Sequence, residues 1–407
     1  MLCQFTYKNF KSYRNETIFD MQASPIGEHL DNLLSVDNSN KLFLPVSVIY
    51  GPNAGGKSGV LEALAALISK VTNPIQTNRK SHKQPSYIEN IECIPFAFDL
   101  ATQHLPTEFT IYYQHKEIEF KYSLSIKNGV VISESLYKKF LGAKNPAKLF
   151  TRDYNGVKLG AGMNKKTINV DVSSDTPYIS FLALFYNYEI IKTAIEWFSS
   201  CIYINFAKYD IVYIPNDFTE KSIILGMLRE IDIPISDISI KNQKNSNSSD
   251  VMPEINIIRE IDGNIFSLDI LQESRGTYKL LGFLSLAITA LKEGRLIIAD
   301  ELDSSIHPKL LRFIIKLFKN KAINKNNAQL LYTSHDVTTM KNDLFRRDEI
   351  WFAAKDDKGV SDIYSLYDIR DEDGMHVKST ASFDRQYLEG RYGADPYLSE
   401  MLSIKWE

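Results

Sequence analysis

The chain has 407 residues, of which 44% are hydrophobic and 24% charged, and its formal net charge is −3. A chain of this length can bury a sizeable core and corresponds to roughly two or three domains. The balanced charge excludes a global attraction to nucleic acid or to anionic membranes, although a local basic patch stays compatible with it. The three cysteines are scattered and form no C-x-x-C pair, which argues against a disulfide framework or a zinc site.

No segment is typical of a membrane anchor or a secretion signal. The first residues contain no apolar core of the kind that signal peptides carry. The longest apolar stretch, residues 280–291, is too short to span a bilayer. We therefore expect a cytoplasmic protein that does not enter a membrane.

The first sixty residues predict strands followed by a helix. Phe5 and Tyr7 alternate with polar neighbours, and residues 17–19 are expected to form the returning strand. Residues 46–49 predict a short buried strand. The apolar residues between 61 and 68 then recur at helical spacing, so a helix is expected to follow.

Between this strand and this helix lies a loop, residues 51–58 (GPNAGGKS), that matches the phosphate-binding pattern G-x-x-x-x-G-K-[ST]. Its glycines let backbone N–H groups surround a pyrophosphate at the positive end of the following helix. A chance match is the alternative, and the strand before the loop and the helix after it argue against it. We expect Lys57 to reach the β and γ oxygens and the Ser58 hydroxyl to hold Mg²⁺. The expected nucleotide-binding residues are Gly51, Pro52, Asn53, Ala54, Gly55, Gly56, Lys57, Ser58 and Gly59.

The middle of the chain predicts sheet and then helices. Residues 92–137 alternate as strands do, and Asn128 with Gly129 predicts a hairpin turn because both positions tolerate positive φ. Residues 177–232 are expected to be helical. Their aromatic side chains are expected to form core or an interface between lobes, and a groove for a ligand or partner is the alternative.

After the polar stretch 241–250 the chain returns to the order strand, helix, strand. The phosphate loop and this C-terminal half are therefore expected to form one α/β core that an inserted lobe interrupts. We expect three parts: residues 1–69, with the phosphate loop; residues 70–250, an inserted lobe that is first β and then helical; and residues 251–407, the rest of the core and a tail.

Residues 296–301 predict an apolar strand that ends in Asp300 and Glu301. At the carboxyl end of a parallel strand, these carboxylates face the ligand crevice. Asp300 is expected to hold Mg²⁺ through water, and Glu301 to orient or deprotonate the attacking water. Two acids after a strand can equally be solvated turn residues. The phosphate loop elsewhere in the chain favours the catalytic interpretation.

Two further motifs narrow the class. Residues 302–305 (LDSS), with Asp303, follow the acidic pair, and residues 333–336 (TSHD), with His335, end the next apolar strand. An acidic pair, a Leu-Asp step and a strand-terminal histidine occur in this order in ABC-type ATPases. His335 is expected near the γ-phosphate. A metal-phosphohydrolase pair of His335 and Asp336 is the alternative, but the chain has no companion set of residues for it. His307, before Pro308, is expected to cap a helix.

The ABC class also needs a signature loop that opens a helix. Residues 273–277 precede the apolar helix expected over 278–291. The Ser274 hydroxyl and the Gly276 N–H would offer donors to an anion at a helix N-terminus. In ABC-type enzymes this anion is the γ-phosphate bound by the other subunit, so ATP is expected to join two chains head to tail. A plain helix cap is the alternative. The expected signature residues are Glu273, Ser274, Arg275, Gly276 and Thr277.

Together these motifs resemble the soluble SMC/RecF/OLD-like branch of ABC ATPases, within the AAA-type ATPases. Residues 9–13 (NFKSY) add to the resemblance, and residues 387–394 (YLEGRYGA) look like bacterial abortive-infection ATPases of the AbiL/RloA kind. The resemblance implies an α/β P-loop fold with an ABC-type ATPase core, whose mixed sheet is flanked by helices and accompanied by an N-terminal antiparallel β lobe and an inserted α+β lobe. It also implies ATP and Mg²⁺ as cofactors, and a homodimer or higher homo-oligomer formed through ATP.

The sequence departs from that family pattern at two places. Arg275 stands where transporters carry glycine in the signature, so their geometry is not implied here. A Q-loop glutamine, which the family pattern includes, has only Gln84 and Gln103 as candidates. Long coiled-coil arms are absent from the sequence, which argues against DNA tethering of the SMC kind.

The function that the resemblance implies is that of a Mg²⁺-dependent ATPase that acts as a nucleotide-switched sensor or regulator of a separate effector, a nuclease or toxin, in bacterial anti-phage defence. A RecF-like DNA-repair ATPase that binds duplex DNA is the alternative. A third possibility is a scaffold that binds ATP without useful turnover, against which Glu301 argues. A GTPase is disfavoured because the sequence has no N/T-K-x-D motif.

Overall fold

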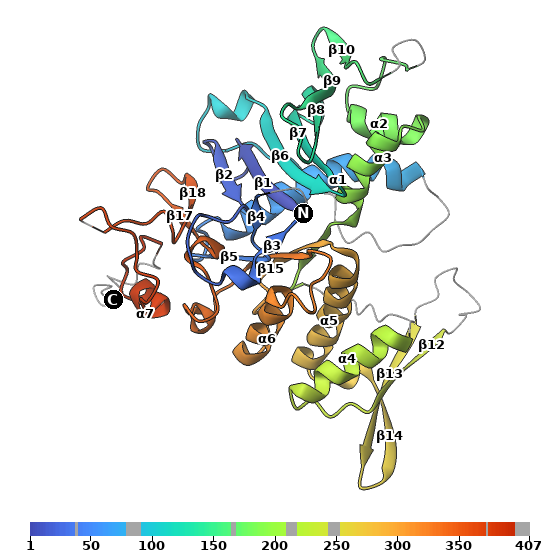
Figure 1. Ribbon diagram of the computed structural model, residues 1–407, viewed down its shortest axis with the longest axis vertical. Helices are drawn as coiled ribbons and strands as arrows, with labels where there is room; N and C mark the ends of the chain where they lie inside the picture. The colour runs from blue at the N-terminus through green and yellow to red at the C-terminus, as the bar shows by residue number, and fades with distance from the viewer. Residues whose placement is uncertain are drawn as a thin grey trace, which may run out of the picture.

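The computed structural model describes residues 1–36, 40–78, 91–163, 168–208, 218–242, 253–371 and 373–394. Two large sheets dominate this part of the chain, and a small sheet extends from one end of the molecule (Figure 1). No helix within the described residues is both long and apolar enough to cross a bilayer.

The first large sheet has six strands in the order β11-β15-β16-β5-β17-β18. The first five are parallel, and β18 is antiparallel to β17, so the sheet is mixed. Every residue of β5, β15 and β16 is buried, as expected for parallel strands covered on both faces. The strands are β5 (Val46–Tyr50), β11 (Ile202–Asn205), β15 (Leu296–Asp300), β16 (Gln329–Thr333), β17 (Ile350–Lys355) and β18 (Ser361–Ser365).

The second large sheet is antiparallel, in the order β10-β9-β8-β7-β6-β1-β2. The returning strand predicted at 17–19 is β2, and the predicted turn at Asn128 and Gly129 joins β7 to β8 with φ of 50° and 78°, so both predictions are confirmed. The strands are β1 (Leu2–Lys8), β2 (Thr17–Asp20), β6 (Thr107–His115), β7 (Ile118–Lys127), β8 (Val130–Phe140), β9 (Ala147–Asp153) and β10 (Gly156–Leu159).

The helices cover the mixed sheet on both faces. Ile298 and Leu331 point into one hydrophobic cluster, with α1 (Lys57–Asn78), α2 (Tyr178–Phe185), α3 (Glu189–Ser200) and the antiparallel sheet. Ile297 and Leu330, one residue earlier on the same strands, point into a second cluster with α5 (Arg275–Glu293) and α6 (Pro308–Lys319). Successive side chains of a strand alternate between faces. The mixed sheet is therefore the middle layer of the core (Figure 1).

The small sheet consists of β12 (Asp237–Asn242), β13 (Pro253–Ile261) and β14 (Asn264–Asp269) and lies beside α4 (Phe218–Glu230) (Figure 1). The remaining strands are β3 (Leu34–Ser35) and β4 (Leu42–Phe43), and the remaining α-helix is the short α7 (Phe383–Leu388). Of the predicted polar connection 241–250, residues 241 and 242 end β12, and 243–250 lie outside the described residues.

The prediction that 177–232 is helical is correct for α2, α3 and α4 but wrong at β11, which lies between α3 and α4, and residues 209–217 lie outside the described residues. A four-residue strand buried on both faces shows no alternation that a sequence pattern could reveal. The division into 1–69, 70–250 and 251–407 stays a prediction. Its first boundary falls within α1, and β1 pairs with β6 across it.

Candidate functional site

The loop 51–58 connects β5 to α1 and is packed tightly against β17 and β18. Gly51 and Gly56 have φ of 147° and 116°, which side chains disfavour. A Cβ on Gly51 would lie 2.2 Å from the carbonyl oxygen of Ala353, and a Cβ on Gly56 would lie 2.7 Å from Oγ of Ser361. Only glycine therefore fits at these two positions of the loop.

The Lys57 side chain lies within the curve of this loop. It is 7% exposed, and its Nζ donates to the carbonyl oxygens of Gly51, at 2.9 Å, and Pro52, at 3.0 Å. Burial lowers the pKa of Lys57, while the carboxylates at the end of β15 and in the turn after it raise it. The first N–H groups of α1 have no acceptor within the helix. The loop thus presents a cation and N–H donors of the kind that bind phosphate.

Asp300, the last residue of β15, is in hydrogen-bond contact with residues from two other predicted motifs, the phosphate loop and the TSHD segment. It is 3% exposed. Its Oδ1 accepts hydrogen bonds from the hydroxyls of Ser58, at 3.1 Å, and Thr333, at 2.6 Å, and its Oδ2 accepts one from Nδ2 of Asn205 at 3.3 Å. Carboxylate and hydroxyl oxygens are ligands that Mg²⁺ prefers, so the pair of Ser58 and Asp300 fits this ion.

The other acidic residues and the histidine surround the same strand ends. Glu301 has a left-handed backbone, with φ of 53°, and its N–H donates to Oγ1 of Thr333 at 2.8 Å. Asp303 accepts, through Oδ2, the backbone N–H of His335 at 2.9 Å. Its buried Oδ1 has no hydrogen-bond partner in the part of the chain that is described. The His335 side chain is exposed and accessible to a ligand.

The candidate signature residues lie at the start of α5. Ser274 is the N-cap of this helix, and its Oγ accepts the N–H of Thr277 at 3.1 Å. Arg275 donates to the carbonyl oxygen of Ala207 at 3.2 Å, and a Cβ on Gly276 would lie 2.8 Å from the carbonyl oxygen of Ser305. Glu273 forms an ion pair with Arg259 at 2.8 Å. Between these residues and the loop 51–58, no hydrogen bond or ion pair is found among the described residues.

The sequence predictions did not include Asn205 and Thr333 as site residues. Both are the last residues of buried parallel strands, and this position is the one signal that could have identified them. Of the two Q-loop candidates, Gln103 donates to the carbonyl oxygen of Ala97, and Gln84 lies outside the described residues.

Tyr13, from the NFKSY segment, contacts the phosphate loop and the start of α1. Its hydroxyl donates to the carbonyl oxygen of Gly56 at 3.1 Å, and its ring would lie 3.0 Å from a Cβ on Gly59. His307 caps α6 as predicted, and its Nδ1 accepts the N–H of Lys309 at 3.2 Å.

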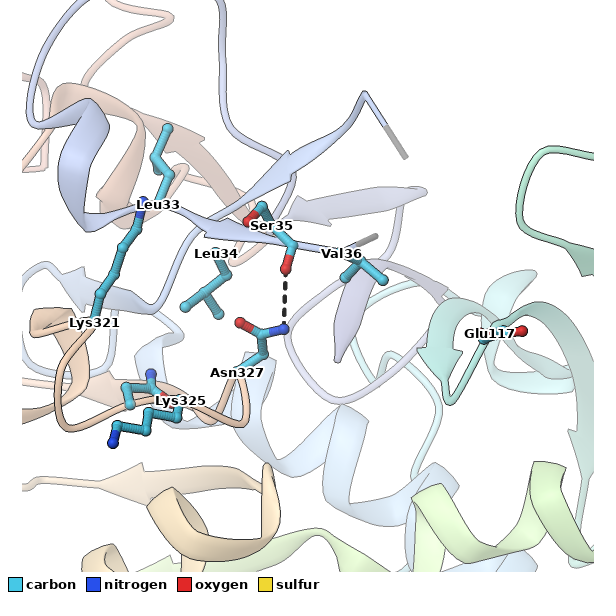
Figure 2. Close-up of a pocket in the computed structure, with 9 residues that line it drawn as sticks. Leu33, Leu34, Ser35, Val36, Glu117, Lys321, Lys325 and Asn327 are labelled. Carbon is cyan, nitrogen blue, oxygen red and sulfur yellow. Dashed lines mark hydrogen bonds between the residues drawn. The ribbon is translucent and has the colours of Figure 1, made fainter. Parts of the chain in front are cut away.

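A separate cavity of about 470 Å³ lies between residues 33–36 and the loop that follows α6 (Figure 2). At its edge the Asn327 amide donates to the carbonyl oxygen of Ser35 at 3.1 Å, and Lys321 and Lys325 line the same side. None of the residues that line this cavity belongs to the site around Asp300.

The profile of one protein family, described as "AAA domain, putative AbiEii toxin, Type IV TA system", matches residues 46–341. A comparison with curated proteins found no match. Two solved structures are similar to the chain at 12% identity. An SMC head bound to the C-terminal winged-helix domain of ScpA has a TM-score of 0.41, with 89% of this chain and 97% of that chain covered. The recombination mediator RecF with a bound ATP analogue has a TM-score of 0.30, with 89% and 98% covered.

The family match and the two large sheets confirm the predicted fold class. The fold is α/β, with the ATPase core of an AAA domain, a mixed sheet flanked by helices, an antiparallel sheet that includes the N-terminal strands, and a small three-stranded sheet beside α4.

Proposed function

Because the chain belongs to the family described as "AAA domain, putative AbiEii toxin, Type IV TA system", we propose that it is a Mg²⁺-dependent ATPase whose nucleotide state regulates a separate effector in anti-phage defence. The observation that carries the ATPase part of this proposal is the contact between Ser58 of the phosphate loop and Asp300 of the acidic strand. Two sequence motifs far apart in the chain thereby form one site.

In this proposal Lys57 and the N–H groups at the start of α1 bind the phosphates. Ser58 and Asp300 would hold Mg²⁺, which neutralises phosphate charge when bound. Glu301 takes the proton of the attacking water or orients it, and the exposed His335 side chain contacts the γ-phosphate. Asn205 and Thr333 keep the Asp300 carboxylate in place through the hydrogen bonds they donate to it.

We further propose that residues 273–277 act on the nucleotide of a second copy, so that ATP joins two chains in a homodimer or a higher assembly. Within one chain these residues make no bond to the loop 51–58 in the described part, while Ser274 lies exposed at a helix N-terminus. A helix N-terminus with a hydroxyl and free N–H groups is suited to an anion supplied from outside.

The regulatory part of the proposal goes beyond the family description, which names a putative toxin of a toxin–antitoxin system but no separate effector. The effector is proposed to be a separate nuclease or toxin, and the lobe over 70–250 is proposed to bind it, because the nucleotide site itself is shared across ATPases. Exchange of this lobe is expected to abolish effector binding and to leave ATP binding intact. Effector binding that survives the exchange would contradict the assignment.

Light scattering of Glu301→Gln with and without Mg²⁺ and ATP tests the composite site. We expect a dimer or larger assembly that ATP strengthens, that Ser274→Arg loses, and that the control Leu271→Arg keeps, since Leu271 is exposed but lies outside the signature. An assembly indifferent to ATP and to Ser274 would refute the trans role.

Release of phosphate by the wild type and by Glu301→Gln tests turnover. Release by the wild type that does not exceed the background would leave a scaffold that binds ATP without catalysis, and equal rates above the background would refute the role of Glu301. Hydrolysis that duplex DNA stimulates, with binding that weakens steeply as salt rises, would instead favour a DNA-repair ATPase.

A further inference from the structure

The antiparallel sheet has a polar face opposite the helices. On β6, β7 and β8 the apolar residues, such as Tyr113, Phe120 and Leu136, belong to the hydrophobic cluster that also contains residues of α1, α2 and α3. The residues between them point to the other face. A cavity of about 460 Å³ hollows that face. Its volume is in the range of ligand-binding clefts, about 300–1,000 Å³.

We call this hollow and its lining the basic sheet face. Most of its lining residues are tyrosines, lysines and serines, namely Tyr112, Lys121, Ser123, Ser135, Tyr137, Lys138 and Lys139, and Glu119 and Pro146 complete it. The sheet register places these side chains in rows. Lys121 on β7 lies opposite Tyr112 on β6 and Tyr137 on β8, and the hydroxyls of Ser123 and Thr110 lie 2.9 Å apart in the next row. The result is a Tyr–Lys–Tyr row beside a row of hydroxyls.

The basic sheet face carries local positive charge on a chain whose net charge is −3. Its acidic lining residue, Glu119, already forms an ion pair with Lys41 at 3.2 Å. For the lining lysines Lys121, Lys138 and Lys139, no ion pair is found within the described part of the chain. Cations that are not neutralised by neighbours attract a polyanion.

We propose that the basic sheet face binds single-stranded nucleic acid. Lysine, serine, threonine and tyrosine are residue types that contact phosphate oxygens. A positively charged groove with aromatic side chains is the arrangement by which proteins bind single strands without sequence preference. Phosphates would contact Lys121 and Lys139, and a base would stack on Tyr137.

The aromatic row favours a single strand over a duplex. In a duplex the bases are stacked inside and can reach a pocket only when they are flipped out. A duplex would therefore contact the basic sheet face only through one phosphate backbone, and no base would stack on Tyr137. None of the residues that line the basic sheet face belongs to the candidate ATP site, so the proposal stands independently of the proposed function.

Fluorescence anisotropy of a labelled oligothymidylate, titrated with the full chain over a series of salt concentrations, tests the proposal. Replacing Lys121 and Lys139 together by glutamine should weaken binding about tenfold or more and reduce the salt slope by about 0.7 per lysine. Tyr137→Leu should weaken it about fivefold or more. Lys127→Gln is the matched control, because Lys127 is exposed on the same strand β7 but does not line the hollow.

Three results would overturn the proposal. The first is an equal loss in Lys127→Gln, which would indicate unspecific attraction to positive surface. The second is duplex binding as tight as single-strand binding with no effect of Tyr137→Leu. The third is no binding of any oligonucleotide at low salt. If the double variant fails to fold in a urea titration, Lys139→Gln alone and Lys121→Arg, which keeps the charge, allow the same comparison.

Discussion

The Thr333 hydroxyl connects the two acidic residues that end β15. It donates to Oδ1 of Asp300 at 2.6 Å and accepts the N–H of Glu301 at 2.8 Å. The second bond stabilises a left-handed backbone at Glu301, which costs a residue other than glycine about 1–2 kcal/mol. The substitution Thr333→Val keeps the shape of the side chain and removes both bonds.

The size of the effect follows from these two contacts. A hydrogen bond to a charged group contributes about 1.5–3 kcal/mol, and one between neutral groups about 0.5–1.5 kcal/mol. Thr333 is 1% exposed and Asp300 is 3% exposed, so water does not replace the hydroxyl. We expect Thr333→Val to lower the free energy of unfolding by about 2–4 kcal/mol. Thr333→Ser, which keeps the hydroxyl and loses a methyl group, should lower it by about 1 kcal/mol.

Urea unfolding measures this difference, and steady-state phosphate release measures its effect on Glu301. In Thr333→Val, kcat should fall about tenfold or more, because a displaced catalytic group loses its alignment. The affinity for ATP should change little, since Lys57 and the phosphate loop keep their contacts. A valine variant as stable and as active as the serine variant would refute the reasoning.

Two further predictions concern stability. Gly51→Ala places a Cβ 2.2 Å from the carbonyl oxygen of Ala353, at a residue whose φ is 147°. We expect this substitution to lower the free energy of unfolding by about 2–5 kcal/mol and to abolish ATP binding. Calorimetry measures both effects. Gly129→Ala is the control, because Gly129 has φ of 78° but a Cβ there would meet nothing within 4 Å, so it should cost only about 1 kcal/mol. Equal losses of stability in Gly51→Ala and Gly129→Ala would contradict the role of the Ala353 contact. Lys319→Met leaves the buried Glu349 carboxylate without its cation and should cost about 3–5 kcal/mol. Burial raises the pKa of Glu349, so the native state keeps the Glu349 proton to a higher pH than the unfolded chain does. The free energy of unfolding of this variant should therefore fall as the pH rises above about 4.3, the pKa of glutamate in an unfolded chain. Thermal unfolding over pH measures this slope, which Glu349→Gln in the same variant should remove.

Local features of the molecule were determined by the sequence alone. The strand before the loop 51–58 and the helix after it form as predicted, because apolar periodicity and glycine placement act within a few residues. The turn at Asn128 and Gly129 is likewise local, since it depends on two residues that tolerate positive φ. The acidic pair was recognisable for the same reason: it directly follows a continuous apolar strand.

Tertiary structure decided which of these local features meet. The pairing of β1 with β6, the strand β11 within a helical stretch, and the contacts of Asn205 and Thr333 with Asp300 join residues that are far apart in the sequence. The hydrogen bonds of Asn205 and Thr333 with Asp300 form only because β11 and β16 are the neighbours of β15 and their carboxyl ends are aligned with its end. Buried parallel strands carry apolar residues toward both faces, so no alternation within them encodes which neighbour each strand takes.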